Sequence, residues 1–181
     1  MRYIIFIFVF SSFILHSDGR GYRNELKKNI NANLLEEKYS ESIKYLEEYT
    51  SKYPEDLIFH IYLAKSYLYR DDLKLHEKIS GIEDIRMIRE NYQKASKIFS
   101  IKIPELEQKT PGDKKLSDFY FYWALAEMFS GNEDRSLGLF KKCISLNPSN
   151  KEAYYNAGII QQKNSNYKDS DKYLKKYISN P

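Results

Sequence analysis

Residues 117–150 read SDFYFYWALAEMFSGNEDRSLGLFKKCISLNPSN, and residues 151–181 read KEAYYNAGIIQQKNSNYKDSDKYLKKYISNP. The second stretch repeats the pattern of the first, because Tyr120 returns as Tyr154 at a step of 34 residues (154 − 120 = 34). Further pairs at the same step are Ala124 and Gly158, Ser136 and Ser170, Phe140 and Leu174, and Ile144 and Ile178. A fixed period of this length is typical of proteins built from stacked repeats.

Each unit carries two apolar stripes at helical spacing and therefore predicts two helices. Residues 130–133, Ser-Gly-Asn-Glu, mark the turn between them, since Gly and Asn are common just after a helix end. Pro148 ends the second helix, because proline cannot donate the backbone N–H that a continuing helix needs. Ser149, three residues before Glu152, has the spacing of a capping box that would start the next helix.

This pattern resembles the tetratricopeptide repeat, a helix–turn–helix unit of 34 residues. The family order of aromatic, large apolar, Gly or Ala, small, aromatic, small and Pro is matched by Tyr120, Trp123, Ala124, Ser136, Phe140, Cys143 and Pro148. Glu127 and Gln161 depart from the family, which usually has an aromatic side chain at that position. Small residues such as Gly158 let the two helices of a hairpin approach closely. The resemblance implies an all-α fold, a right-handed α-solenoid of stacked hairpins.

The same register extends toward the N-terminus. Ser42 and Leu46 lie 94 residues before Ser136 and Phe140 (136 − 42 = 94). The register predicts a helical repeat domain at residues 22–181. The residues before it, 1–21, are assigned to a leader whose character is described below. Within that domain the approximate units are 23–56, 57–116, 117–150 and 151–181.

The second unit is predicted to be expanded. Ala64 lies 60 residues before Ala124 (124 − 64 = 60), which exceeds one period. The extra residues are assigned to insertions at 71–87 and 104–116, and the second of these is predicted to be an exposed loop. Between them, a helix of unusual length is predicted to start near Ile82.

The first residues have the character of an export signal. Met1 and Arg2 precede an apolar run at residues 3–15, which is shorter than the stretch of about 20 residues that spans a membrane. A cleaved signal peptide is the favoured interpretation, and an uncleaved membrane anchor or a buried first helix are the alternatives. Export, to the periplasm or cell envelope if the source is bacterial, follows from the first two.

Composition supports a folded helical chain and offers no sign of catalysis. The 181 residues are 42% hydrophobic and 30% charged, and 7 Gly with 5 Pro leave few turns for an all-β fold. A net charge of +4 with mixed signs gives no support for nucleic-acid binding. His60 and His76 lack partners at metal-ligand spacing, and the lone Cys143 is assigned to packing. We therefore expect no metal, no cofactor and no enzymatic activity.

By the family's register, the first helices of the units line a concave groove that binds a peptide or protein partner. The predicted groove residues are Lys27, Asn31, Ile61, Tyr62, Lys65, Tyr69, Phe121, Tyr122, Leu125, Met128, Tyr155, Asn156 and Ile159. For Tyr69, Met128 and the neighbouring Phe129, packing against the insertion or the next helix is the alternative. Such an aromatic trough suits peptides with apolar anchors.

Some family members grip a terminal carboxylate with cations and amides, and Lys27 and Asn31 resemble the first pair of that clamp. Tyr62, Asp118 and Tyr122 replace its other members, and Asp118 would repel a carboxylate. The clamp is therefore rejected as the expected binding mode. Self-assembly through the last repeat is the alternative function, and an enzyme with an unrecognised site is the remote one.

Overall fold

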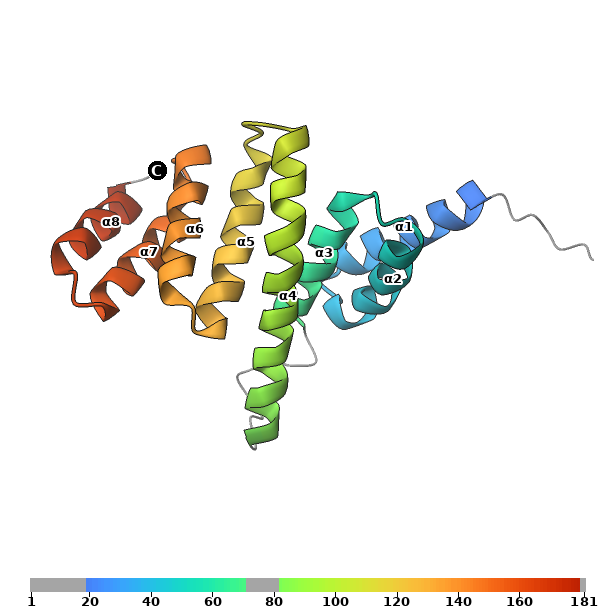
Figure 1. Ribbon diagram of the computed structural model, residues 1–181, viewed down its shortest axis with the longest axis horizontal. Coiled ribbons are helices and arrows are strands. Elements are labelled where there is room, and N and C mark those ends of the chain that lie inside the picture. The colour runs from blue at the N-terminus through green and yellow to red at the C-terminus, as the bar shows by residue number, and fades with distance from the viewer. Residues whose placement is uncertain (1–18, 71–81, 180–181) are drawn as a thin grey trace, which may run out of the picture.

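The computed structural model describes residues 19–70 and 82–179, and in these residues it contains helices and turns but no strand (Figure 1). The helices are α1 Gly19–Leu35, α2 Tyr39–Lys52, α3 Leu57–Leu68, α4 Ile82–Lys109, α5 Lys115–Ser130, α6 Glu133–Leu146, α7 Lys151–Lys163 and α8 Tyr167–Ser179. Residues 1–18, which make up most of the predicted leader, and residues 71–81 lie outside the described residues, whereas residues 19–21 of that leader belong to α1. The predicted all-α fold is confirmed.

The helices are stacked in chain order, from α1 and α2 at one end to α8 at the other (Figure 1). Each helix packs against the one that follows it, and α3 also contacts α5, so first helices of neighbouring hairpins touch. The core runs through the stack from Leu26 and Ile30 in α1 to Ile160 in α7. A solenoid of stacked hairpins is therefore the observed architecture.

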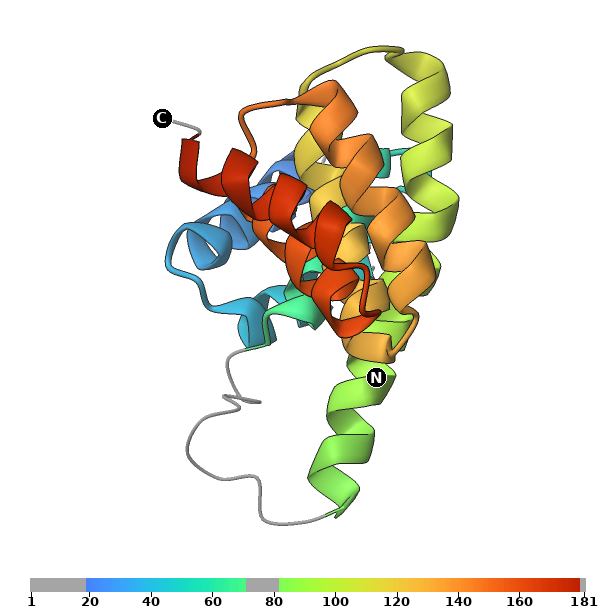
Figure 2. The same cartoon turned by 90° about the vertical axis from the view of Figure 1, so that its left-hand side faces the viewer.

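The second hairpin is expanded by its long second helix. α4 has 28 residues and begins at Ile82 as predicted, while α6 has 14 residues. Seen from the α8 end, α4 extends beyond the other helices of the stack (Figure 2). The second hairpin therefore has a projection that the other hairpins lack.

The expectation of a loop over residues 104–116 is wrong for most of its length. Pro104 lies inside α4, and only residues 110–114 form the exposed link to α5. An internal proline costs a helix about 3 kcal/mol, because it removes a hydrogen bond and crowds the preceding turn. The fully buried Ile103 and the partly buried Leu106 hold this segment against the core, and their packing offsets that cost.

Three hairpin turns share one backbone motif at one repeat position. Gly131, Ser165 and Glu37 each take a left-handed conformation, with φ of 91°, 59° and 56°. After α5, the N–H of Asn132 donates to the carbonyl of Glu127 at 2.9 Å and that of Gly131 to Met128 at 3.0 Å. This pair of bonds is the Schellman motif, which closes a helix C-terminus. Glycine occupies this position in only one of the three turns, so glycine alone would predict the motif at Gly131 and not at Ser165 or Glu37.

The start of α7 differs from the predicted capping box. Its N-cap is Asn150, whose side-chain oxygen accepts from the backbone N–H of Ala153 at 2.9 Å. Asn is among the strongest N-cap residues, so the neighbouring Ser149 is not needed for this bond. Ser149 is exposed in the turn before the helix.

The departures at Glu127 and Gln161 have a common explanation. Glu127 is 1% exposed, and its carboxylate accepts from Asn132 Nδ2 at 2.7 Å and pairs with Arg135 at 3.1 Å. One repeat later, Gln161 accepts from Asn166 Nδ2 at 3.0 Å. Buried polar groups need such partners. A polar bridge to the hairpin turn thus replaces the aromatic contact in both repeats.

Two buried serines differ in whether their hydroxyl groups are hydrogen-bonded, and removing each hydroxyl should change the stability in opposite directions. The Ser66 hydroxyl is fully buried in α3 and has no hydrogen-bond partner among the described residues, whereas that of Ser136 donates to the carbonyl of Ala124 at 2.8 Å. Ser66→Ala is expected to raise the free energy of unfolding by about 1 kcal/mol, because an unpaired buried hydroxyl is removed. Ser136→Ala is expected to lower it by about 1 kcal/mol. Urea denaturation followed by circular dichroism measures both free energies. A destabilised Ser66→Ala protein would contradict the claim that the Ser66 hydroxyl is buried without a hydrogen bond.

Candidate functional site

A surface pocket lies where α1, α2 and α3 meet. Its volume is about 390 Å³, and we call it the α1–α3 pocket. Its lining residues are Asn31, Leu34, Leu35, Tyr39, Tyr62 and Lys65. A volume of this order lies in the range of small-ligand pockets, so it has room for a few side chains of a partner.

Helix spacing and the turn between α1 and α2 explain why these side chains meet in the pocket. Tyr62 and Lys65 lie one turn apart on α3 and therefore share a face. Leu34 and Leu35 end α1, and the left-handed Glu37 turns the chain so that Tyr39 begins α2 beside them. Leu35 is 85% exposed at the end of α1, where it borders the pocket.

A row of tyrosine rings continues from the pocket toward α5. The ring of Tyr69 lies 5.7 Å from that of Tyr39 and meets that of Tyr122 edge-on at 5.9 Å. Lys65 Nζ lies 4.8 Å from the centre of the Tyr122 ring, a cation–π geometry. Burial raises the pKa of Tyr69 above its ordinary value, so its hydroxyl stays neutral at pH 7. The row extends the apolar character of the pocket along the stack.

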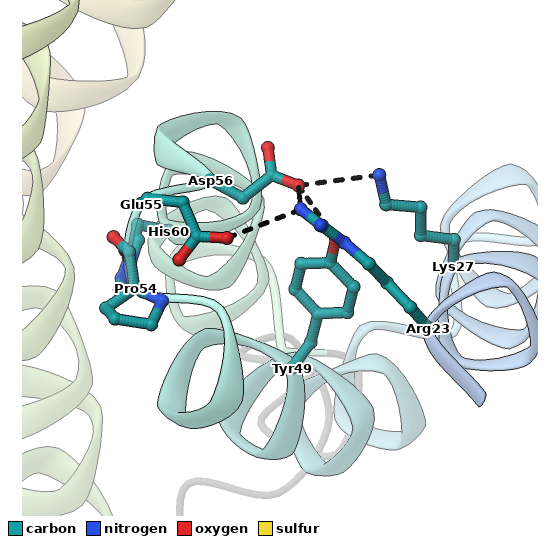
Figure 3. Close-up of polar contacts among 7 residues, drawn as sticks. All are labelled: Arg23, Lys27, Tyr49, Pro54, Glu55, Asp56 and His60. Atoms are coloured by element: carbon teal, nitrogen blue, oxygen red, sulfur yellow. Dashed lines mark hydrogen bonds and ion pairs between the residues drawn. The ribbon is translucent and has the colours of Figure 1, made fainter. Parts of the chain in front are cut away.

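A charged cluster holds α1 against the rest of the stack (Figure 3). Asp56 precedes α3, and its Oδ2 accepts from Tyr49 Oη at 2.7 Å and from Arg23 Nη2 at 3.0 Å. Lys27 Nζ lies 3.4 Å from the same oxygen. Because Arg23 and Lys27 come from α1 and Tyr49 comes from α2, one carboxylate ties three helices together.

The cluster fixes the ionisation of Asp56. Burial is the largest single influence and acts to raise the pKa of Asp56. The hydrogen bonds from Tyr49 and Arg23 and the charge of Lys27 together outweigh burial, and the pKa lies below its ordinary value. Asp56 is therefore ionised at neutral pH, and Lys27, predicted to line the groove, is engaged in this internal ion pair.

The other predicted groove residues lie in several different environments. Asn31, Tyr62 and Lys65 meet in the α1–α3 pocket, and Tyr69 and Tyr122 form the adjoining row. Ile61 and Leu125 are 1% and 8% exposed, so both belong to the core and offer no open surface. Their burial follows from stacking, because neighbouring helices cover the faces on which they lie.

Phe121 and Met128 are partly buried and pack against the core, and the Phe121 ring lies 5.7 Å from that of Phe140 in α6. Phe121 is thus turned toward its own hairpin partner. For Met128, this placement agrees with the packing alternative considered from the sequence.

The last hairpin carries a separate apolar patch. Tyr155 and Ile159 of α7 are 45% and 38% exposed, and the Tyr155 ring lies 5.3 Å from that of Tyr177 in α8. The side chain of Asn156 donates to the carbonyl of Glu152 within α7. Ile178 of α8 is 79% exposed, and self-assembly through this hairpin stays a prediction.

Three lining residues of the pocket were not predicted. Leu34 and Leu35 end α1 and Tyr39 begins α2, so all three border a turn that the groove prediction did not include. The signal for them was the unbroken apolar pair Leu34-Leu35 at the end of an otherwise polar helix. Such a pair next to a turn indicates either a buried helix end or an exposed contact surface.

The remaining candidate groups for chemistry are structural. Cys143 is fully buried, with its Sγ 3.2 Å from Ser117 Oγ, and burial raises the pKa of its thiol to about 11. A protonated, buried thiol is a poor nucleophile. Burial also lowers the pKa of His60, and its Nε2 donates to the carbonyl of Pro54 at 3.1 Å (Figure 3).

Within residues 19–70 and 82–179, no group of three His, Cys, Asp or Glu side chains is arranged to hold a metal ion. In the same part of the chain, no helix combines the length and apolar character required to cross a membrane.

The stacked hairpins and the open pocket between first helices define a helical-repeat protein of the kind that serves as a scaffold for protein–protein interaction. Residues 139–172 match the family model of the tetratricopeptide repeat. Residues 139–172 therefore carry a tetratricopeptide repeat, in agreement with the resemblance seen in the sequence.

Solved structures of similar fold include a MamA protein, with 17% identity and a TM-score of 0.42 over 87% of this chain and 91% of the other. MamA AMB-1 gives 15% identity and a TM-score of 0.43 over 88% and 96%. MamA 41-end from Desulfovibrio magneticus RS-1 gives 13% and 0.41 over 86% and 93%. A search of curated proteins finds no significant match.

The Asp56 cluster predicts a specific pH dependence. Asp56→Asn is expected to lower the free energy of unfolding by roughly 1 to 2 kcal/mol at pH 7, since hydrogen bonds to a charged group are weakened. The folded pKa of Asp56 is depressed, so its stabilisation is present above the unfolded pKa of about 3.9 and is lost as pH falls through the folded value. The difference between the two proteins should therefore shrink below about pH 4.

Urea unfolding at several pH values measures this difference. Glu55→Gln is the matched control, because Glu55 is 64% exposed and lies 3.6 Å from Arg23 at the rim of the cluster. We expect that change to have little effect at any pH. A gap between wild type and Asp56→Asn that is the same at pH 3 and pH 7 would contradict the role of the Asp56 charge.

Proposed function

We propose that this protein is an exported, non-catalytic adaptor that binds a peptide segment of a partner protein in the α1–α3 pocket. The observation that carries the proposal is the pocket itself, open to solvent and lined by Tyr39, Tyr62, Leu34 and Leu35. Aromatic and aliphatic side chains held on a rigid frame supply large contact area at low entropic cost, which is typical of peptide-binding surfaces.

The arrangement of the pocket supports a peptide over a folded domain as the bound element. Its volume suits a few side chains, and the tyrosine row from Tyr69 to Tyr122 offers a continuing track for the chain on either side. The Asp56 cluster fixes α1, so the wall that carries Leu34 is positioned before the partner arrives. A preformed site binds without the cost of ordering its own residues.

A selection experiment tests this function. A phage-displayed library of random 12-residue peptides is panned on the folded protein, and enriched peptides are measured by fluorescence polarisation. Tyr62→Asp is expected to weaken their binding at least tenfold, because a charge is placed in the apolar pocket. Tyr167→Asp is the matched control: Tyr167 is 67% exposed at the start of α8, and its change should leave binding intact.

Circular dichroism of both variants shows whether either change disturbs the fold. Tyr62 is partly buried and packs beside Phe59, so only binding data from a folded Tyr62→Asp protein are compared. If folded Tyr62→Asp binds the enriched peptides as tightly as wild type does, the pocket is not the binding site.

Export is supported by the leader sequence alone. The basic start and the apolar run at residues 3–15 suit recognition as a signal peptide. Expression in a Gram-negative bacterium should place the protein outside the cytoplasm, with an intact mass that lacks about the first 21 residues. Retention of the full mass in the membrane fraction would support an anchor, and a cytoplasmic full-length protein would contradict export.

A further inference from the structure

Lys65 is the one charged residue among those that line the α1–α3 pocket. The other lining residues are two leucines, two tyrosines and Asn31. A single cation in such a lining determines which charge a bound segment can bring into the pocket, because every other contact is neutral.

Lys65 is a partly buried residue, and its ammonium group has no acidic partner within the described part of the chain. Its resolved interaction is with the face of the Tyr122 ring, 4.8 Å from the ring centre. Lys27, which belongs to α1, is by contrast paired with Asp56. The charge of Lys27 is therefore neutralised within the protein, whereas Lys65 lines the pocket without a counter-charge from the described residues.

An ammonium group without a counter-charge, on a partly buried residue, gains from a carboxylate that approaches it. The tyrosine ring on one side and the pocket on the other restrict the direction of that approach. Asn31, from the facing helix α1, can donate or accept a hydrogen bond at the opposite wall. The site thus combines one positive charge, one amide and an apolar floor.

Resting on the peptide-binding function proposed above, we infer that the pocket selects segments in which an aspartate or glutamate lies beside a large apolar side chain. The carboxylate pairs with Lys65 Nζ, and the apolar side chain packs between Leu34, Leu35 and the tyrosine rings. The charge fixes the register of the segment, and the apolar contact supplies most of the affinity.

The chemistry favours a carboxylate over a phosphate group. Phosphate recognition typically uses clustered arginines that donate two parallel bonds, whereas this pocket holds one lysine. A lone ammonium group matches the single charge of an acidic side chain.

The test uses the random 12-residue library on wild type and on Lys65→Gln. Wild type should enrich Asp or Glu next to Leu, Ile, Phe, Met or Tyr, and Lys65→Gln should lose the acidic preference but keep the apolar one. For one enriched peptide, Lys65→Gln should weaken binding about tenfold, while the same peptide with its acid changed to the amide should bind both proteins equally.

Lys94→Gln is the matched control, because Lys94 also lies over a tyrosine ring, 5.6 Å from the centre of Tyr67, but outside the pocket. It should select the same peptides as wild type. If wild type enriches neutral or basic peptides and Tyr62→Asp abolishes their binding, the acidic selectivity is wrong. The peptide-binding function of the pocket would then still hold. Enrichment of no peptide would overturn both proposals.

Discussion

A single helical hairpin of this chain cannot bury its own apolar side chains, and this constraint shapes the rest of the structure. The helices must approach closely, and at Gly158 a Cβ atom would lie only 2.8 Å from Leu174. The next hairpin must then cover the remaining face, as the contact between α3 and α5 shows. First helices that are aligned in this way leave part of their surface open, and the α1–α3 pocket is one such opening.

The parts of the fold that depend on this constraint could be predicted from the sequence. Ala124, Phe140 and Ser136 recur at a fixed step because each occupies the same contact in successive hairpins, and all three are fully buried. The length of α4 was also visible, since its apolar stripe continues from Ile88 to Phe99. Pro104 was misassigned because a local rule about proline was applied where tertiary packing of Ile103 prevails.

The pocket was harder to predict because it depends on how two hairpins are placed relative to each other. Glu37 adopts the left-handed conformation that Gly131 adopts at the same repeat position, so no glycine marked the turn beside which Leu35 and Tyr39 come together. Ile61 and Leu125 were assigned to the groove by register alone. Their burial depends on the neighbouring helices, which a periodic pattern does not locate.

The contrast between Lys27 and Lys65 shows where sequence reasoning about charge ends. Both are lysines on first helices, and both were assigned to the groove on equal grounds. Asp56, which follows Pro54 by two residues in the loop before α3, reaches back to α1 and takes Lys27 out of the binding surface. Lys65 contacts the face of the Tyr122 ring and has no acidic partner among the described residues. A positive residue in a repeat protein thus takes part in recognition only if the stack has not already supplied its counter-charge, and the loops between hairpins decide this as much as the helices do.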